Sequence, residues 1–168
     1  MNDNLEILAD YYCNQNSKNK LTEIWYKEVK DLLDNNKVDV IYEIYEEGFL
    51  GAWYYIITKN NMKYIVKHKL NDVNTKMMMN ALLYQKETIK INIELLSIIH
   101  NYNKLTTRNK PDGSTFKVLA INNRYALIEE KSNDFSIYII VQNGVSSTCL
   151  QFANLISAVN MYYKDFAA

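Results

Sequence analysis

Three charged side chains in the second half of the chain, Asp112, Glu129 and Lys131, have types and spacing that could do chemistry together. Asp112 follows the only proline, and after sixteen intervening residues the chain reads Glu-Glu-Lys at positions 129–131. Two carboxylates on neighbouring strands can bind a hard divalent cation, and a lysine beside them can offset the charge of a phosphate. These residues therefore form the candidate catalytic set of the chain.

The pattern resembles the PD-(D/E)xK nuclease signature over residues 111–131. The resemblance implies that Asp112 and Glu129 hold Mg²⁺ and that Lys131 stabilises the attacking water or the phosphate. The chain departs from the family where a strand, residues 136–141, is expected in place of a helix, and Glu94 is the best candidate for the acid of the preceding helix. The alternative interpretation is a surface turn at Pro-Asp-Gly and a solvated strand end at Glu-Glu-Lys.

The other reactive residue types form no catalytic or metal-binding pattern. His68 and His100 are the only histidines, and neither has a nucleophile and an acid at a defined spacing. Cys13 and Cys149 lie far apart without CxxC spacing, which indicates two reduced thiols and no zinc site. The chain has no G-x-G-x-x-G or GK[ST] motif, so we expect no nucleotide cofactor and no metal.

Two clusters could instead bind another macromolecule. Trp53, Tyr54 and Tyr55 precede several lysines, and aromatic and basic residues on one sheet face can stack bases, although strand propensity alone also predicts aromatics there. Met77-Met78-Met79 could form an adaptable apolar docking surface, because methionine repacks readily against different partners. The alternative is that this helix fills the core; even then, three consecutive methionines cannot all face inward.

The composition indicates a folded, neutral protein. The chain has 168 residues, 48% of them apolar, with 19 basic and 19 acidic side chains. It is too apolar for a disordered chain, too poor in cysteine for a disulfide scaffold, and too neutral for a protein that coats nucleic acid. The N-terminus lacks a signal-peptide pattern and no apolar run is long enough to span a bilayer, so we expect a cytoplasmic protein without membrane contact. The abundance of Asn, Lys, Ile and Tyr is typical of an AT-rich, low-GC genome.

Hydrophobic periodicity predicts the order α-α-βββ-α-βββ-α. Two helices are expected over residues 3–12 and 22–35. A third begins at Asp72 or Asn74 and ends at Tyr84, and a fourth begins at residues 146–147 and ends at Tyr163. Two three-stranded meanders, about 38–70 and 115–142, contain tight turns at 60–61, 122–123 and 132–134. Residues 88–93 fit a strand or a helix; their length favours a helix that continues to about Asn103.

This order predicts a single α+β domain, residues 1–168, with antiparallel sheet packed against helices. We expect a small cytosolic module that binds another protein without catalysis, such as an inhibitor, immunity or accessory protein of a phage or mobile element in an AT-rich bacterium. The element order also resembles that of class I type III secretion chaperones, which would imply a homodimer. Nucleic acid is the less favoured partner, and the Mg²⁺-dependent nuclease is the alternative function.

Overall fold

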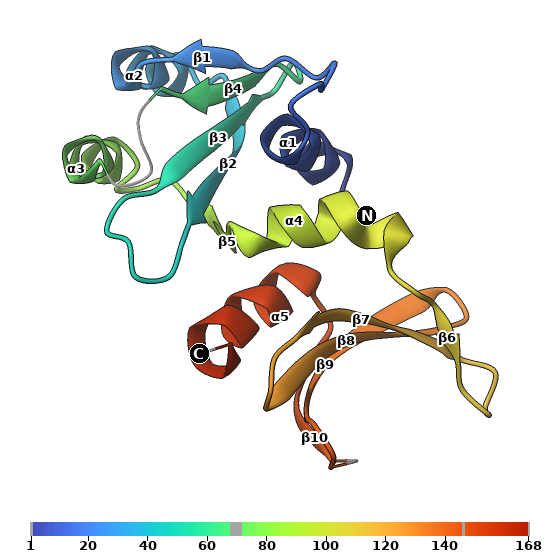
Figure 1. The fold of residues 1–168 in the computed structure, drawn as a ribbon. Helices are drawn as coiled ribbons and strands as arrows, with labels where there is room; N and C mark the ends of the chain where they lie inside the picture. Colours follow the sequence, from blue (N-terminus) through green and yellow to red (C-terminus); the bar gives the residue numbers. More distant parts are fainter. Residues whose placement is uncertain (1, 68–71, 146, 168) are drawn as a thin grey trace. The chain divides into compact units, whose positions relative to one another are not determined.

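The computed structural model describes residues 2–67, 72–145 and 147–167 and confirms the α+β class (Figure 1). The chain forms two compact units. One unit comprises the N-terminal segment that ends at Cys13 together with the residues from Glu94 onward. The other unit comprises Asn14–Ile93. The single domain over 1–168 remains a prediction.

The unit Asn14–Ile93 contains a five-stranded sheet in the order β1-β4-β3-β2-β5. Strands β2, β3 and β4 form the first predicted meander, with antiparallel pairing, whereas β1 lies parallel to β4 and β5 lies parallel to β2. The strands are β1 Thr22–Ile24, β2 Val38–Tyr45, β3 Trp53–Thr58, β4 Lys63–Val66 and β5 Ile89–Asn92. Helices α2 (Tyr26–Asp34) and α3 (Val73–Leu82) cover one face, where Val29 and Met79 pack into a core with Ile41, Tyr54 and Ile56.

Two predictions for this unit were wrong in detail. Residues 22–24 form a strand rather than the first turn of a helix, because pairing with Tyr64–Val66 of β4 satisfies their backbone and buries Ile24. The helix begins after Trp25, whose backbone N–H donates to the Glu28 carboxylate at 2.7 Å. The ambiguous segment 88–93 contains strand β5, and a helix begins only at Glu94. Residues 68–70 of the expected strand lie outside the described residues.

Asparagine supplies left-handed backbone in two of the three predicted tight turns, 60–61 and 132–134, but not in the turn at 122–123. Asn61 has φ 65° and Asn133 has φ 54°. A short polar side chain tolerates this region better than a larger one, and glycine tolerates it best. Asn61 therefore contributes to the register in which β3 pairs with β4.

Replacing Asn61 with alanine should destabilise the protein by about 1 kcal/mol, whereas Asn61→Gly should cost nothing measurable. Urea unfolding of the two variants measures the difference. The matched control is Asn123→Ala, because Asn123 is an exposed turn asparagine that is not among the residues with positive φ. An equal loss in Asn61→Ala and Asn61→Gly would contradict the backbone explanation.

The other unit contains an antiparallel sheet in the order β10-β9-β8-β7-β6, in which β7, β8 and β9 form the second predicted meander. Its strands are β6 Arg108–Asn109, β7 Thr115–Ile121, β8 Tyr125–Ser132, β9 Phe135–Gln142 and β10 Thr148–Phe152. Its helices are α1 (Asp3–Cys13), α4 (Glu94–Asn101), which continues into a 3-10 turn at Tyr102–Lys104, and α5 (Leu155–Met161), which ends in a π-helical turn at Tyr162–Phe166. Helices α1 and α4 pack against each other, and α5 packs against β9 (Figure 1).

The final helix starts later than predicted. Residues 148–152 form strand β10, antiparallel to β9, and Ser146, where the helix was expected to open, lies outside the described residues. Gly144 has φ 78°, which allows the turn after β9 to bring β10 back along the sheet. Asn154 then caps α5, because its side chain accepts a hydrogen bond from the Ser157 N–H at 3.2 Å.

None of the helices within residues 2–67, 72–145 and 147–167 has the length and apolar character needed to cross a bilayer.

Candidate functional site

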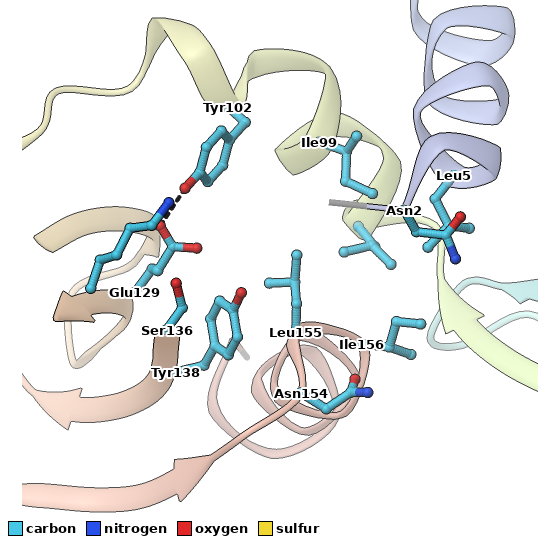
Figure 2. A pocket seen from close by; sticks show the side chains of 12 residues that line it. Asn2, Leu5, Ile99, Tyr102, Glu129, Ser136, Tyr138, Asn154, Leu155 and Ile156 are labelled. Atoms are coloured by element: carbon cyan, nitrogen blue, oxygen red, sulfur yellow. Dashed lines mark hydrogen bonds between the residues drawn. The ribbon is translucent and has the colours of Figure 1, made fainter. Parts of the chain in front are cut away.

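Glu129 and Lys131 line one cavity of about 370 Å³ in the unit that contains β6–β10 (Figure 2). Both residues lie on β8 two positions apart, so their side chains leave the same face of the sheet. Glu129 is buried, with 4% of its surface exposed, whereas Lys131 is exposed. The structure therefore brings two of the three predicted catalytic residues together.

Asp112 lies at the tip of the turn between β6 and β7 and does not line this cavity. Its carboxylate accepts hydrogen bonds from the hydroxyl and the backbone N–H of Ser114, which lower the pKa of Asp112. This is the turn role that the Pro-Asp-Gly alternative predicts. Among the described residues, no group of three or more His, Cys, Asp or Glu side chains is arranged to hold a metal ion.

Strand register places polar side chains in two rows across the sheet face around Glu129. Glu129 lies directly opposite Lys117 on β7 and opposite Tyr138 on β9. The next row along β8 pairs Lys131 with Thr115 and Ser136. The cavity wall therefore carries charged and hydroxyl groups at one end.

Two tyrosines lie beside the buried Glu129 carboxylate, Tyr102 by a hydrogen bond and Tyr138 directly opposite on β9. The Tyr102 hydroxyl, from the 3-10 turn after α4, donates to Oε1, and Figure 2 shows its ring directed at Glu129. Burial, with the adjacent Glu129 charge and hydrogen bond, raises the pKa of Tyr138 to about 12. Burial and the Glu129 hydrogen bond likewise raise the pKa of Tyr102. Both hydroxyls therefore stay protonated near neutral pH, and that of Tyr102 acts as a donor to the carboxylate.

The nearest lysines do not pair with Glu129 directly. Lys117 donates to the Tyr102 carbonyl at 3.1 Å, and its ammonium lies 4.0 Å from the centre of the Tyr102 ring. Within the described part of the chain, no basic nitrogen lies within 4 Å of the Glu129 carboxylate oxygens. The side-chain ammonium of Lys131 forms no hydrogen bond or ion pair with any described residue. Glu129 is thus a buried carboxylate with a tyrosine hydroxyl donor and, among the described residues, no cation in contact.

The other end of the cavity is lined mainly by apolar residues. Figure 2 shows Ile99 of α4, Leu5 of α1 and the α5 residues Leu155 and Ile156 on the side away from Glu129. Leu95, Asn2 and Asn154 complete this part of the lining. The cavity therefore joins a polar end that contains a buried charge to an apolar end formed by three helices.

A second buried carboxylate, Glu43, lies in the other unit and is compensated differently. The Tyr54 hydroxyl donates to its Oε1 at 3.0 Å, and the ammonium groups of Lys76 and Lys90 lie 3.9 and 3.8 Å from its oxygens. These residues line a cavity of about 350 Å³. Glu43 therefore has two cations near it, in contrast to Glu129.

The predicted binding residues have different exposures. Tyr54, Tyr55 and Met79 are fully buried, and Trp53 is partly buried. Met77 is 64% exposed and Met78 43% exposed. The surface-accessible part of the predicted set is therefore on α3 rather than on β3.

An exposed apolar row runs along the outer face of α3. Val73, Met77, Ala81 and Tyr84 are all exposed and recur at spacings of four, four and three residues, which places them on one side of a helix. Tyr84, just after the helix, is 83% exposed. We call these four residues the α3 row.

The remaining predicted reactive groups do not gather. Cys13 is partly buried and Cys149 is exposed; both are free thiols. His100 lies in the last turn of α4, and His68 lies outside the described residues.

Sequence reasoning did not identify Tyr102, Tyr138 or Glu43 as site residues. The turn at Asn133 could have identified Tyr138, because closing the hairpin at Ser132 and Phe135 sets Glu129 opposite Tyr138. No local spacing connects Tyr102 with Glu129, since the contact joins the 3-10 turn after α4 to β8. Comparisons of the chain with protein-family models, with curated proteins and with solved structures find no match.

Proposed function

We propose that this chain is a protein-binding module that acts by interaction without catalysis, and that the α3 row is its contact surface. The observation that carries the proposal is the continuous apolar character of Val73, Met77, Ala81 and Tyr84 on the exposed side of α3. Residues on the opposite side of the same helix, Met79 and Leu82, already pack into the core. Core packing therefore does not account for the exposed row.

The side chains of this row suit a protein partner. Apolar groups arranged together on a surface gain free energy when another apolar surface removes them from water. Tyrosine and methionine are enriched at protein interfaces, and methionine adapts its shape to the partner. An inhibitor, immunity or accessory protein of a phage or mobile element would use a surface of this kind.

Met77→Lys should weaken the complex about tenfold or more, because it places a charge at the centre of the contact. The measurement is capture of host proteins by tagged wild type and variant, followed by the dissociation constant for each partner recovered. The matched control is Phe135→Lys, the same kind of change at a residue that is 61% exposed and outside the α3 row. A partner that binds both variants as tightly as wild type would contradict the proposed surface.

The capture experiment, together with a cleavage assay and light scattering, separates the binding module from the nuclease and the homodimer. The nuclease retains support from one observation, that Glu129 and Lys131 line the same cavity. It predicts recovered nucleic acid and Mg²⁺-dependent cleavage that Asp112→Ala, Glu129→Ala and Lys131→Ala each abolish. A homodimer, as in the chaperone alternative, would appear as a change in molar mass in light scattering.

A further inference from the structure

We propose that the cavity around Glu129 binds a small zwitterion, an α-amino acid with a large apolar side chain. In this arrangement Glu129 accepts hydrogen bonds from the ligand ammonium, Lys131 pairs with the ligand carboxylate, and the apolar end of the cavity holds the side chain. This inference is independent of the α3 row.

The burial of the Glu129 carboxylate beside the cavity supports the ammonium subsite. A buried carboxylate needs compensation, and its two oxygens can accept about four hydrogen bonds. Tyr102 supplies a hydroxyl donor, and no described basic nitrogen lies within 4 Å of the carboxylate oxygens. Glu43, the comparable buried carboxylate, has Lys76 and Lys90 within 4 Å. Glu129 thus has acceptor capacity for a cationic donor inside the cavity.

Lys131 supports the carboxylate subsite. Lys131 lines the same cavity and is exposed, and its side-chain ammonium forms no bond with any described residue. Residues two apart on a strand have Cα atoms about 7 Å apart. Groups of opposite charge therefore leave one face of the strand beside the cavity, as a ligand with an ammonium and a carboxylate on the same carbon requires. A simple cation would leave Lys131 as a repulsive neighbour, and a simple anion would be repelled by the buried Glu129.

The apolar side chain of the ligand is inferred from the rest of the cavity lining. Leu5, Leu95, Ile99, Leu155 and Ile156 form an apolar end contributed by three helices. The cavity volume of about 370 Å³ is at the small end of the range for ligand pockets. An aliphatic or aromatic amino-acid side chain matches that lining better than a polar one.

The test uses the full-length protein and four probes: L-phenylalanine, L-leucine, phenethylamine and 3-phenylpropionate. Isothermal titration calorimetry should show that phenylalanine and leucine bind, and that the amine without a carboxylate and the acid without an amine each bind at least about tenfold more weakly. Absence of binding by both amino acids at millimolar concentration overturns the proposal. Equal affinity for phenylalanine and phenethylamine also overturns it.

Two variants assign the subsites. Lys131→Met should reduce phenylalanine affinity about tenfold and should leave phenethylamine affinity equal or higher, whereas Glu129→Gln should weaken both. Lys164→Met is the control, since Lys164 is exposed in the same unit and does not line the cavity. Lys131 is exposed, so its variant keeps the test valid even if Glu129→Gln impairs folding. Loss of phenylalanine binding in Lys164→Met, or no change in Lys131→Met, would overturn the assignment.

Discussion

Replacing Tyr54 with phenylalanine should destabilise the protein by about 2 kcal/mol, whereas the same change at the next residue, Tyr55, should be neutral or stabilising. Both side chains are fully buried on β3, and both variants lose one hydroxyl group. The difference lies in what each hydroxyl does. Tyr54 donates to the buried Glu43 carboxylate at 3.0 Å, and its loss leaves that charge with one donor fewer.

The Tyr55 hydroxyl has no hydrogen-bond partner among the described residues. Its ring lies 5.9 Å from that of Tyr42 and stacks on it with an interplanar angle of 24°. Phenylalanine keeps the ring and removes an unsatisfied polar group, whose burial costs about 1–3 kcal/mol in proteins. The variant should therefore be at least as stable as wild type.

Urea unfolding at pH 7 measures both variants. We expect the free energies of unfolding to differ by about 2 kcal/mol or more between Tyr54→Phe and Tyr55→Phe. A double variant of Tyr54→Phe with Glu43→Gln checks the mechanism, because the Tyr54 effect should shrink when the carboxylate loses its charge. Equal losses at the two positions would show that shape, and not hydrogen bonding, controls this part of β3.

The two meanders could be predicted from the sequence because their signals are local. Alternation of apolar residues along β2, and asparagine in the turns at 60–61 and 132–134, each act within a few residues. Asn61 and Asn133 adopt the left-handed backbone that such turns require. Antiparallel neighbours joined by short turns therefore follow from the chain itself.

Two strands that the sequence did not predict, or left ambiguous, depend on partners distant in the chain. Strand β1 pairs with β4 some forty residues later, and β5 pairs in parallel with β2. Each segment is short, and each has apolar spacing that also fits a helix. Tertiary pairing, which satisfies backbone groups and buries Ile24 and Ile91, decides between the two conformations.

The candidate site could likewise be predicted only where its signals are local. Glu129 and Lys131 share a face because they are two apart on a strand, which the sequence alone indicates. Asp112 was grouped with them by motif spacing, yet its carboxylate bonds to Ser114 in the turn. Tyr102 reaches Glu129 from the 3-10 turn after α4, and no residue spacing encodes that contact.

Raising the pH from 10 to 12 should remove about 5 kcal/mol of stability through Tyr54 and Tyr55 alone. Burial raises the pKa of both side chains above the value of about 10 expected in the unfolded chain, and the Glu43 charge adds to the rise at Tyr54. Above pH 10 the folded protein therefore binds more protons than the unfolded chain, so the free energy of unfolding falls as pH rises. The stabilising contribution is fully present below pH 10 and is lost as pH rises toward the folded-state pKa values.

Each tyrosine that remains protonated only in the folded state lowers stability by about 1.4 kcal/mol per pH unit in this range. Tyr138 and Tyr163, each with a pKa raised to about 12 mainly by burial, act in the same direction. The free energy of unfolding of a typical domain is about 5–15 kcal/mol, so we expect unfolding close to pH 12. Circular dichroism should then be lost together with a rise in tyrosinate absorbance. Tyr55→Phe should flatten the pH dependence by about 1.4 kcal/mol per unit, and titration of all 14 tyrosines near pH 10 in a protein that stays folded would contradict the argument.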